Sequence, residues 1–144
     1  MQRLSRDENG VAALELALVL PILLIMFAGI VDFGIIYWQQ HVLTSAARQG
    51  ARAASLYQST ANVEAVATQY VRDAGIDTSD LSSQITAEPV PNDTGSMNVV
   101  TLRKPYRFTL LPVFFDSFNY IFGTNTFPTS ITLTGRAKMV IVAL

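Results

Sequence analysis

The sequence contains no cysteine, a single histidine and few charged residues. Of its 144 residues only 15% are charged, and the formal net charge is -1. Without cysteine there is no disulfide framework, no thiol nucleophile and no zinc site of the common Cys/His kind, so we expect no metal and no cofactor. A nucleic-acid-binding protein usually carries a strongly basic face, so this near-neutral balance of charges argues against that class. The length allows one modest domain.

The hydrophobic residues, 50% of the total, are concentrated near the N-terminus. From Val11 to Trp38 the chain reads VAALELALVLPILLIMFAGIVDFGIIYW, interrupted only by Glu15 and Asp32. About twenty apolar residues cross the hydrocarbon core of a bilayer, so this run predicts a transmembrane helix. It is too long for the apolar core of a cleaved secretory signal.

The basic residues on either side of this run bear on its orientation. Arg3 and Arg6 precede it, and the next basic residues are Arg48 and Arg52. Positive charge close to the membrane favours the cytoplasmic side, so we expect a cytoplasmic N-terminus. The charges alone also permit the opposite orientation.

Glu15 is unusual because it lies inside the apolar run. A carboxylate at the bilayer centre costs roughly 2.5 to 3.5 kcal/mol on insertion scales. In one interpretation Glu15 lies at the headgroup level and reaches the cytoplasm. In the other, the chain is cut after Gly10, and the new ammonium at Val11 forms a charge pair with Glu15 within or between chains.

A polar leader that ends in glycine, a glutamate five residues later and a long apolar helix resemble the precursors of type IV pilins. More narrowly, the segment GVAALELALVLPILLIMFAGIVDFGIIYWQQHVLTSAARQGARAAS resembles the TadE-like pseudopilins of the Flp/Tad (tight adherence) pilus system. Three features carry the resemblance: the spacing from Gly10 to Glu15, Pro21 within LVLPILL, and the small residues of AARQGARAA.

The resemblance implies a function in pilus assembly and surface attachment. A prepilin peptidase would cut between Gly10 and Val11, and Glu15 would pair with an N-terminal charge during subunit assembly. Leu16 follows the glutamate where Flp major pilins commonly have tyrosine, which favours a minor pilin or pseudopilin. The alternative function is an uncleaved, membrane-anchored accessory or binding module of a Tad secretion apparatus.

The resemblance also implies partners and a location. The partners would be the prepilin peptidase, other pilin or pseudopilin subunits, inner-membrane platform proteins of the Tad system and membrane lipid. The chain would cross the bacterial inner membrane once, with a periplasmic or extracellular head, and could enter the pilus. We expect no enzymatic activity, because the sequence offers no acid/base pair and no nucleophile motif.

The helix is expected to continue past the membrane. Pro21 predicts a bend within the span, since proline removes one backbone hydrogen bond, but no proline follows Trp38 before Pro89. A helix from about Val11 to about Leu56 would be roughly 70 Å long.

Small residues and a lone histidine lie in the part of this helix that projects from the membrane. Ala46, Gly50 and Ala54 form a small-residue stripe that would pack either on the chain's own head or on another subunit. His41, without a second ligand or a nucleophile motif nearby, is expected to be an exposed helix residue.

The rest of the chain predicts a small α+β head. Residues 60–74 form an amphipathic helix with Gly75 as its C-cap, and the apolar face groups Val63, Val66, Ala67, Tyr70, Val71 and Ala74. The runs MNVVTLRKPYRF and ITLTGRAKMVIVAL alternate with a period of two and predict an antiparallel pair, to which QITAEPV adds a third strand. Lys104 on the apolar side and Pro105 next to it predict an edge strand or a bulge.

An aromatic segment, LLPVFFDSFNYIFGTNTFP, separates the last two strands. It is either a short helix that covers the sheet or an exposed patch that contacts a partner or the membrane surface. The candidate patch residues are Phe114, Phe115, Phe118, Tyr120 and Phe122. Asp32 is expected to lie at the outer headgroup level, with a partner contact inside the membrane as the alternative.

The expected organisation is therefore a leader at 1–10, a transmembrane and projecting helix at 11–57 and a head at 58–144. The fold class is α+β, a type IV pilin-like long N-terminal transmembrane helix with a second amphipathic helix and a small antiparallel sheet. Within the head, residues 59–96 hold one base and six acids, whereas residues 97–144 hold five bases and one acid. The two groups either complement each other or leave a basic sheet face for anionic surfaces. The run DAGIDTSD lacks the ligand order of a calcium loop and is expected to be solvated.

Overall fold

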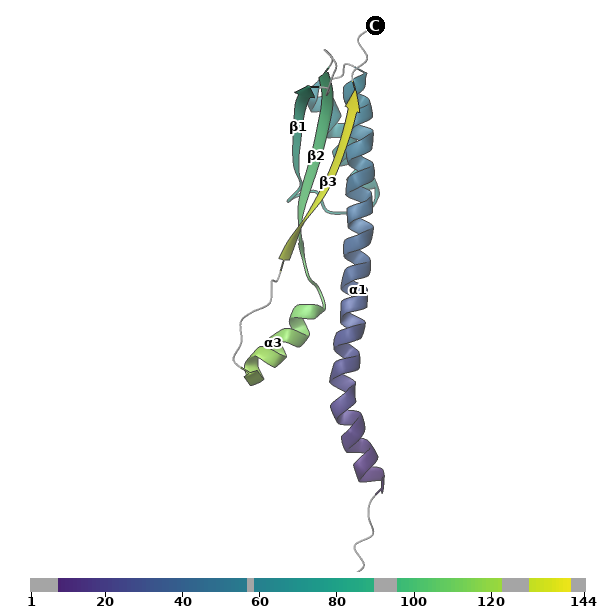
Figure 1. Cartoon of the computed structure of the whole chain (residues 1–144), viewed down its shortest axis with the longest axis vertical. Coiled ribbons are helices and arrows are strands. Elements are labelled where there is room, and N and C mark those ends of the chain that lie inside the picture. Colours follow the sequence, from purple (N-terminus) through teal and green to yellow (C-terminus); the bar gives the residue numbers. More distant parts are fainter. Residues whose placement is uncertain (1–7, 57–58, 90–95, 123–129, 141–144) are drawn as a thin grey trace, which may run out of the picture. The chain divides into compact units, whose positions relative to one another are not determined.

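The computed structural model describes residues 8–56, 59–89, 96–122 and 130–140. Its elements in chain order are α1 (Glu8–Ser55), α2 (Thr60–Asp73), β1 (Ser82–Pro89), β2 (Ser96–Arg107), α3 (Leu111–Phe122) and β3 (Ser130–Val140) (Figure 1). The expected α+β architecture, with a long N-terminal helix, a second helix and a small antiparallel sheet, is confirmed. The chain divides into two compact units, residues 1–33 with 108–127 and residues 34–107 with 128–144, and α1 runs through both.

Helix α2 begins and ends with local capping interactions. The Ser59 hydroxyl accepts a hydrogen bond from the Asn62 amide at 3.4 Å, which satisfies one of the free N–H groups of the first turn. At the other end Gly75 adopts a φ of 77°, and the Gly75 and Ile76 amides donate to the Arg72 and Val71 carbonyls. This pattern is a Schellman motif, which requires the left-handed conformation that glycine adopts without strain.

The core of the second unit lies between the C-terminal half of α1, α2 and the sheet. Side chains at spacings of three and four on α1 meet a stripe on α2 and the inner face of β2. The buried residues include Leu43, Ala46, Ala47, Ala51, Ala53, Ala54, Val63, Ala67, Val71, Ile76, Val100, Leu102, Tyr106 and Leu133. The expected apolar face of α2 was too wide, because Val66 and Tyr70 are exposed while only the narrower stripe at 63, 67 and 71 is buried.

The sheet has the strand order β1-β2-β3, and both pairs are antiparallel. Because β2 is the central strand, the edge position expected from Lys104 and Pro105 is wrong for the strand as a whole. β1 begins with Ser82 opposite Arg103, so Pro105 pairs only with Thr132 of β3 and lacks a neighbour on the other side. Lys104 is 8% exposed on the inner face and does not lie in open solvent at an edge.

Helix α1 and strand β3 approach each other backbone to backbone. A Cβ added to Gly135 would overlap the carbonyl group of Leu43 and would lie 2.8 Å from the Thr44 nitrogen. Nearby, the Gln40 side-chain amide donates to the Thr134 carbonyl at 2.7 Å. Any side chain at position 135 would therefore push the helix off the strand.

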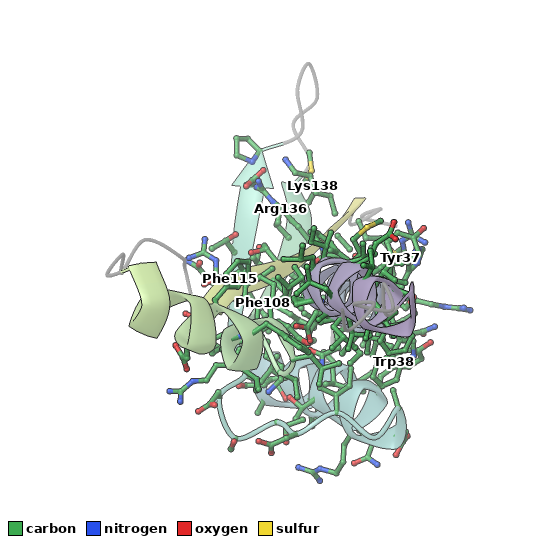
Figure 2. The ribbon with its side chains drawn as sticks, turned by 90° about the horizontal axis from the view of Figure 1, so that it is seen from below. Tyr37, Trp38, Phe108, Phe115, Arg136 and Lys138 are labelled. Atoms are coloured by element: carbon green, nitrogen blue, oxygen red, sulfur yellow. The ribbon has the colours of Figure 1, made fainter. Side chains whose placement is uncertain are left out.

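An ion-pair network crosses the outer face of the sheet. Glu88 of β1 binds Arg136 and Lys138 of β3, each at 2.6 Å; Figure 2 shows Arg136 and Lys138 side by side. The Lys138 hydrogen bond, followed by the charges of Lys138 and Arg136, lowers the pKa of Glu88 against the opposing effect of desolvation. An acidic residue of the 59–96 segment thus pairs with two basic residues of the 97–144 segment within the chain.

We predict that Gly135→Ala destabilises the head by about 1–3 kcal/mol, since overpacking against a backbone cannot be relieved by a rotamer change. The measurement is the thermal midpoint of the full chain in detergent, followed by circular dichroism. Gly34→Ala in α1 is the matched control, because a Cβ there has no atom within 4 Å. An equal midpoint for both variants would contradict the close approach.

We predict that the stabilising contribution of Glu88 depends on pH. Its folded-state pKa lies below the usual value of 4.5, so the contribution is complete above about pH 4.5 and is lost as the pH falls through the lower folded value. The difference in thermal midpoint between the wild type and Glu88→Gln should therefore shrink on acidification below that value. Asp80→Asn, which removes another exposed acid, is the control, and a constant difference for Glu88→Gln would contradict the prediction.

Candidate functional site

The first unit presents a long apolar surface on α1. In the part of the chain that the structure describes, the only helix long and apolar enough to cross a membrane is Gly10–Ser55, with a mean hydropathy of 2.6 in its most apolar window. Its large side chains are exposed in the isolated chain: Val11, Leu14, Leu16, Leu18, Val19, Leu20, Ile22, Leu23, Leu24, Met26, Phe27, Ile30 and Phe33. Such a surface needs an apolar environment, and its length is compatible with a single-pass membrane anchor.

The expected processing residues lie at the start of this surface. Gly10 and Val11 are exposed and helical, and Glu15 is exposed one turn further on. Residues four apart lie on the same side of a helix, so an amino group at Val11 would come close to the Glu15 carboxylate. The cut itself and the charge pair stay predictions. Pro21 is also exposed, and α1 continues through it.

The small-residue stripe lies against the chain's own head. Ala46, Gly50 and Ala54 are all buried. A Cβ on Gly50 would lie 3.2 Å from the Ala67 Cβ of α2 and 3.3 Å from a Val100 methyl of β2. In this single chain the stripe therefore packs α1 against α2 and β2.

Asp32 holds the start of α3, a role that the sequence analysis missed. Its side chain is fully buried, with 0% exposure. Oδ1 accepts hydrogen bonds from the Thr109 and Leu110 amides at 3.2 and 3.3 Å, and Oδ2 accepts from the Leu110 and Leu111 amides at 3.1 and 2.8 Å. These amides lie at the positive end of the helix dipole and have no acceptor within the helix. A carboxylate from α1 thus acts as the cap of a helix that lies 77 to 79 residues further along the chain.

The aromatic segment does form a helix, α3, but it is not grouped with the sheet. It belongs to the unit that contains residues 1–33, whereas the three strands belong to the other unit. Phe114 and Phe115 are half-buried, and Figure 2 shows Phe115 and Phe108 on the same side of α1. The side chains of the other patch candidates, Phe118, Tyr120 and Phe122, lie outside the described residues.

Little in the sequence could have revealed the Asp32 contact. Pro112 near the start of the aromatic run is a typical signal for the first turn of a helix, and Leu110, at the N-cap position, has no side-chain oxygen that could act as a cap. A helix start without a local cap indicates that an acceptor must come from elsewhere. The sequence does not say that the acceptor is Asp32.

The remaining candidates, His41 and the DAGIDTSD run, make only local contacts among the described residues. His41 is exposed and contacts the Tyr37 ring edge-on, with ring centroids 4.6 Å apart. Asp77 accepts hydrogen bonds from the Ser79 hydroxyl and amide, which lower the pKa of its carboxyl. Among the described residues no group of three His, Cys, Asp or Glu could hold a metal ion.

The family comparison concerns the same stretch of α1. Residues 10–52 match the TadE-like protein family. The resemblance seen in the sequence is therefore confirmed for this TadE-like segment, which links the chain to the Tad pilus system. The family is one of pilus-related structural proteins and is not known for enzymatic activity. No curated protein and no solved structure shows significant similarity to the chain.

We predict that Asp32→Ala loosens the start of α3. Loss of a cap costs about 0.5–2 kcal/mol, which corresponds to roughly 2-fold to 30-fold in local opening. The measurement is amide hydrogen exchange at residues 109–111 of the full chain in detergent, which should become faster. Asp116→Ala, the loss of an exposed acid in α3 itself, is the matched control, and equal exchange in the wild type and Asp32→Ala would contradict the capping role.

Proposed function

We propose that this protein is a minor pilin or pseudopilin that assists assembly of a Flp/Tad-type pilus after a prepilin peptidase cuts between Gly10 and Val11. The observation that supports this most is the extent of the family match. It begins at Gly10, the residue expected to precede the cut, and includes the whole apolar surface of α1. The rest of the expected leader lies outside the match.

The exposed apolar surface supports a subunit with two environments. In the bilayer, lipid would cover the side chains from Val11 to Phe33; in a filament, the helices of neighbouring subunits would cover them. Burying one Leu or Phe side chain contributes about 1.5–3 kcal/mol, so either environment is strongly favoured over water.

Glu15 would set the position of a subunit among its neighbours. It is exposed on this surface and has no described cation within its own unit. A buried carboxylate in an apolar environment needs a charged partner, and the Val11 ammonium of the same or a neighbouring chain would supply one. This pairing requires the cut, because an uncut Val11 has only an amide nitrogen.

The second candidate function is an uncleaved, anchored accessory or binding module of the Tad apparatus. One observation favours it: the Ala46, Gly50 and Ala54 stripe is occupied by the chain's own head and is not free for another helix. Both functions require the membrane span. They differ in whether the chain is cleaved and in whether it enters the filament.

We predict that co-expression with the cognate prepilin peptidase yields a protein whose N-terminal residue is Val11, as read by N-terminal sequencing. Gly10→Leu should stay uncut, because a large side chain would not fit where the peptidase accepts glycine. An intact leader on the wild-type chain in the presence of active peptidase would contradict the proposed processing.

Glu15→Gln separates processing from assembly in the same experiment. This variant keeps the size of the side chain and should still be cut, but it should be depleted from sheared filaments or fail to support their formation. Glu64→Gln in the exposed part of α2 is the matched control. A cut Glu15→Gln protein that supports filaments as well as the wild type would contradict the role of Glu15, whereas an uncut but active wild type would favour the accessory module.

A further inference from the structure

Helix α3 is short, aromatic and almost uncharged. Its sequence, LPVFFDSFNYIF, contains one charged residue, Asp116. In the part of α3 whose side chains the structure describes, Leu111, Phe114 and Phe115 fall on one side by helical spacing and are half-buried, while Val113 and Asp116 fall on the other side and are exposed. A helix of 12 residues that has an apolar stripe of Leu111, Phe114 and Phe115, and a single charge on the opposite side, can lie in the plane of a membrane surface.

The position of Asp32 along α1 relates this helix to the bilayer. The residues from Val11 to Val31 would extend about 31 Å at 1.5 Å per residue, which matches a hydrocarbon core of about 30 Å. Asp32 is therefore the first residue beyond the core. Tyr37 and Trp38 follow on α1 (Figure 2), with 68% and 47% exposure, and such aromatic residues are typical of the membrane–water interface.

The four hydrogen bonds to Asp32 fix the first turn of α3 at this same level. Since Asp32 is fully buried and its two oxygens accept from three successive amides, the start of α3 cannot move along α1 without losing these bonds. At about 18 Å, α3 is too short to cross the bilayer. Leu111, Phe114 and Phe115, which keep part of their surface exposed, and Val113 on the opposite side, with 62% exposure, therefore lie where the lipid headgroups meet the acyl chains.

We propose that α3 is an interfacial helix that binds lipid in the leaflet at the Asp32 end of the span, and that Asp32 positions it there. The partner of its apolar stripe is the bilayer itself. The membrane-spanning helix α1 and the Asp32 contact together hold this stripe at the membrane surface. The proposal rests on α1 crossing a membrane. It does not depend on cleavage after Gly10 or on entry into a filament.

The absence of native cysteine makes the proposal directly testable, since any introduced cysteine is the only one in the chain. Val113→Cys, Phe114→Cys and Asp116→Cys are each labelled with an environment-sensitive fluorophore in the full chain, reconstituted in vesicles of phosphatidylethanolamine and phosphatidylglycerol. Quenching by spin-labelled acyl chains is compared with quenching by aqueous iodide. Leu18→Cys in the span and Arg52→Cys at the exposed end of α1 give the two reference values.

We predict that the label at position 114 is quenched several-fold more by acyl chains than the label at 116, with position 113 between them. A depth of about 5–10 Å below the headgroup boundary is expected for the apolar face of such a helix. Iodide quenching of all three labels at the Arg52→Cys value would overturn the proposal. Protection of the labels from iodide that appears only when other pilin subunits are added would also overturn it, because the stripe would then contact protein and not lipid.

Asp32→Ala tests the positioning role in the same vesicles. The acyl-chain quenching at 114 should fall towards the value at 116, while the labels at 18 and 52 keep their values and show that the span and the head are intact. Asp32→Asn, which keeps one acceptor oxygen, should have an intermediate effect. Unchanged quenching at 114 in both variants would overturn the role of Asp32.

Discussion

The distribution of side-chain size along α1 is the constraint on which the rest of the structure depends. From Val11 to Phe33 the helix carries large apolar side chains, most of which are exposed in the described chain. From Leu43 to Ala54 its buried residues are mostly alanine and glycine, and here it packs against α2 and the sheet. Small side chains let backbones approach closely, which is why Gly50 can meet Ala67 and why Gly135 of β3 can lie on the backbone of Leu43. One continuous helix is thus suited to two environments, because its side chains change from large and apolar to small along its length.

The two carboxylates of the apolar segment, Asp32 and Glu15, differ in where they find hydrogen-bond donors or a charged partner. A carboxylate that is removed from water must keep its hydrogen-bond donors or find a charged partner. Asp32 finds three backbone amides within its own chain and is fully satisfied in the isolated molecule. Glu15 is exposed on the apolar surface, and in the proposed function its partner comes from processing or from another subunit. Asp32 is therefore part of the fold, whereas Glu15 is the residue that the proposed assembly function requires.

The sequence predicted the elements well and their tertiary roles less well, for physical reasons. Apolar periodicity is a local property, so the long helix, α2 with its Gly75 cap and the strand pairs followed from spacing alone. The central position of β2 did not, because Lys104 and Pro105 favour an edge, and the structure accommodates them by starting β1 opposite Arg103. The contact between Asp32 and residue 109 could not be derived from spacing, since the two positions are 77 residues apart. The family resemblance was carried by residues 10–52, where short-range spacing is the signal.

A lipid-bound α3 has a consequence for the proposed pilus function. Withdrawal of a subunit from the bilayer into a filament would remove α3 from lipid together with α1, and each Phe side chain transferred to water would cost about 1.5–3 kcal/mol. Neighbouring subunits would have to cover the stripe of Leu111, Phe114 and Phe115 in addition to the span. A subunit that stays in the membrane while it starts or regulates assembly avoids this cost. With α3 bound to lipid as proposed, the Asp32 contact would keep the stripe at the bilayer surface and would favour a minor subunit over a repeating subunit of the filament.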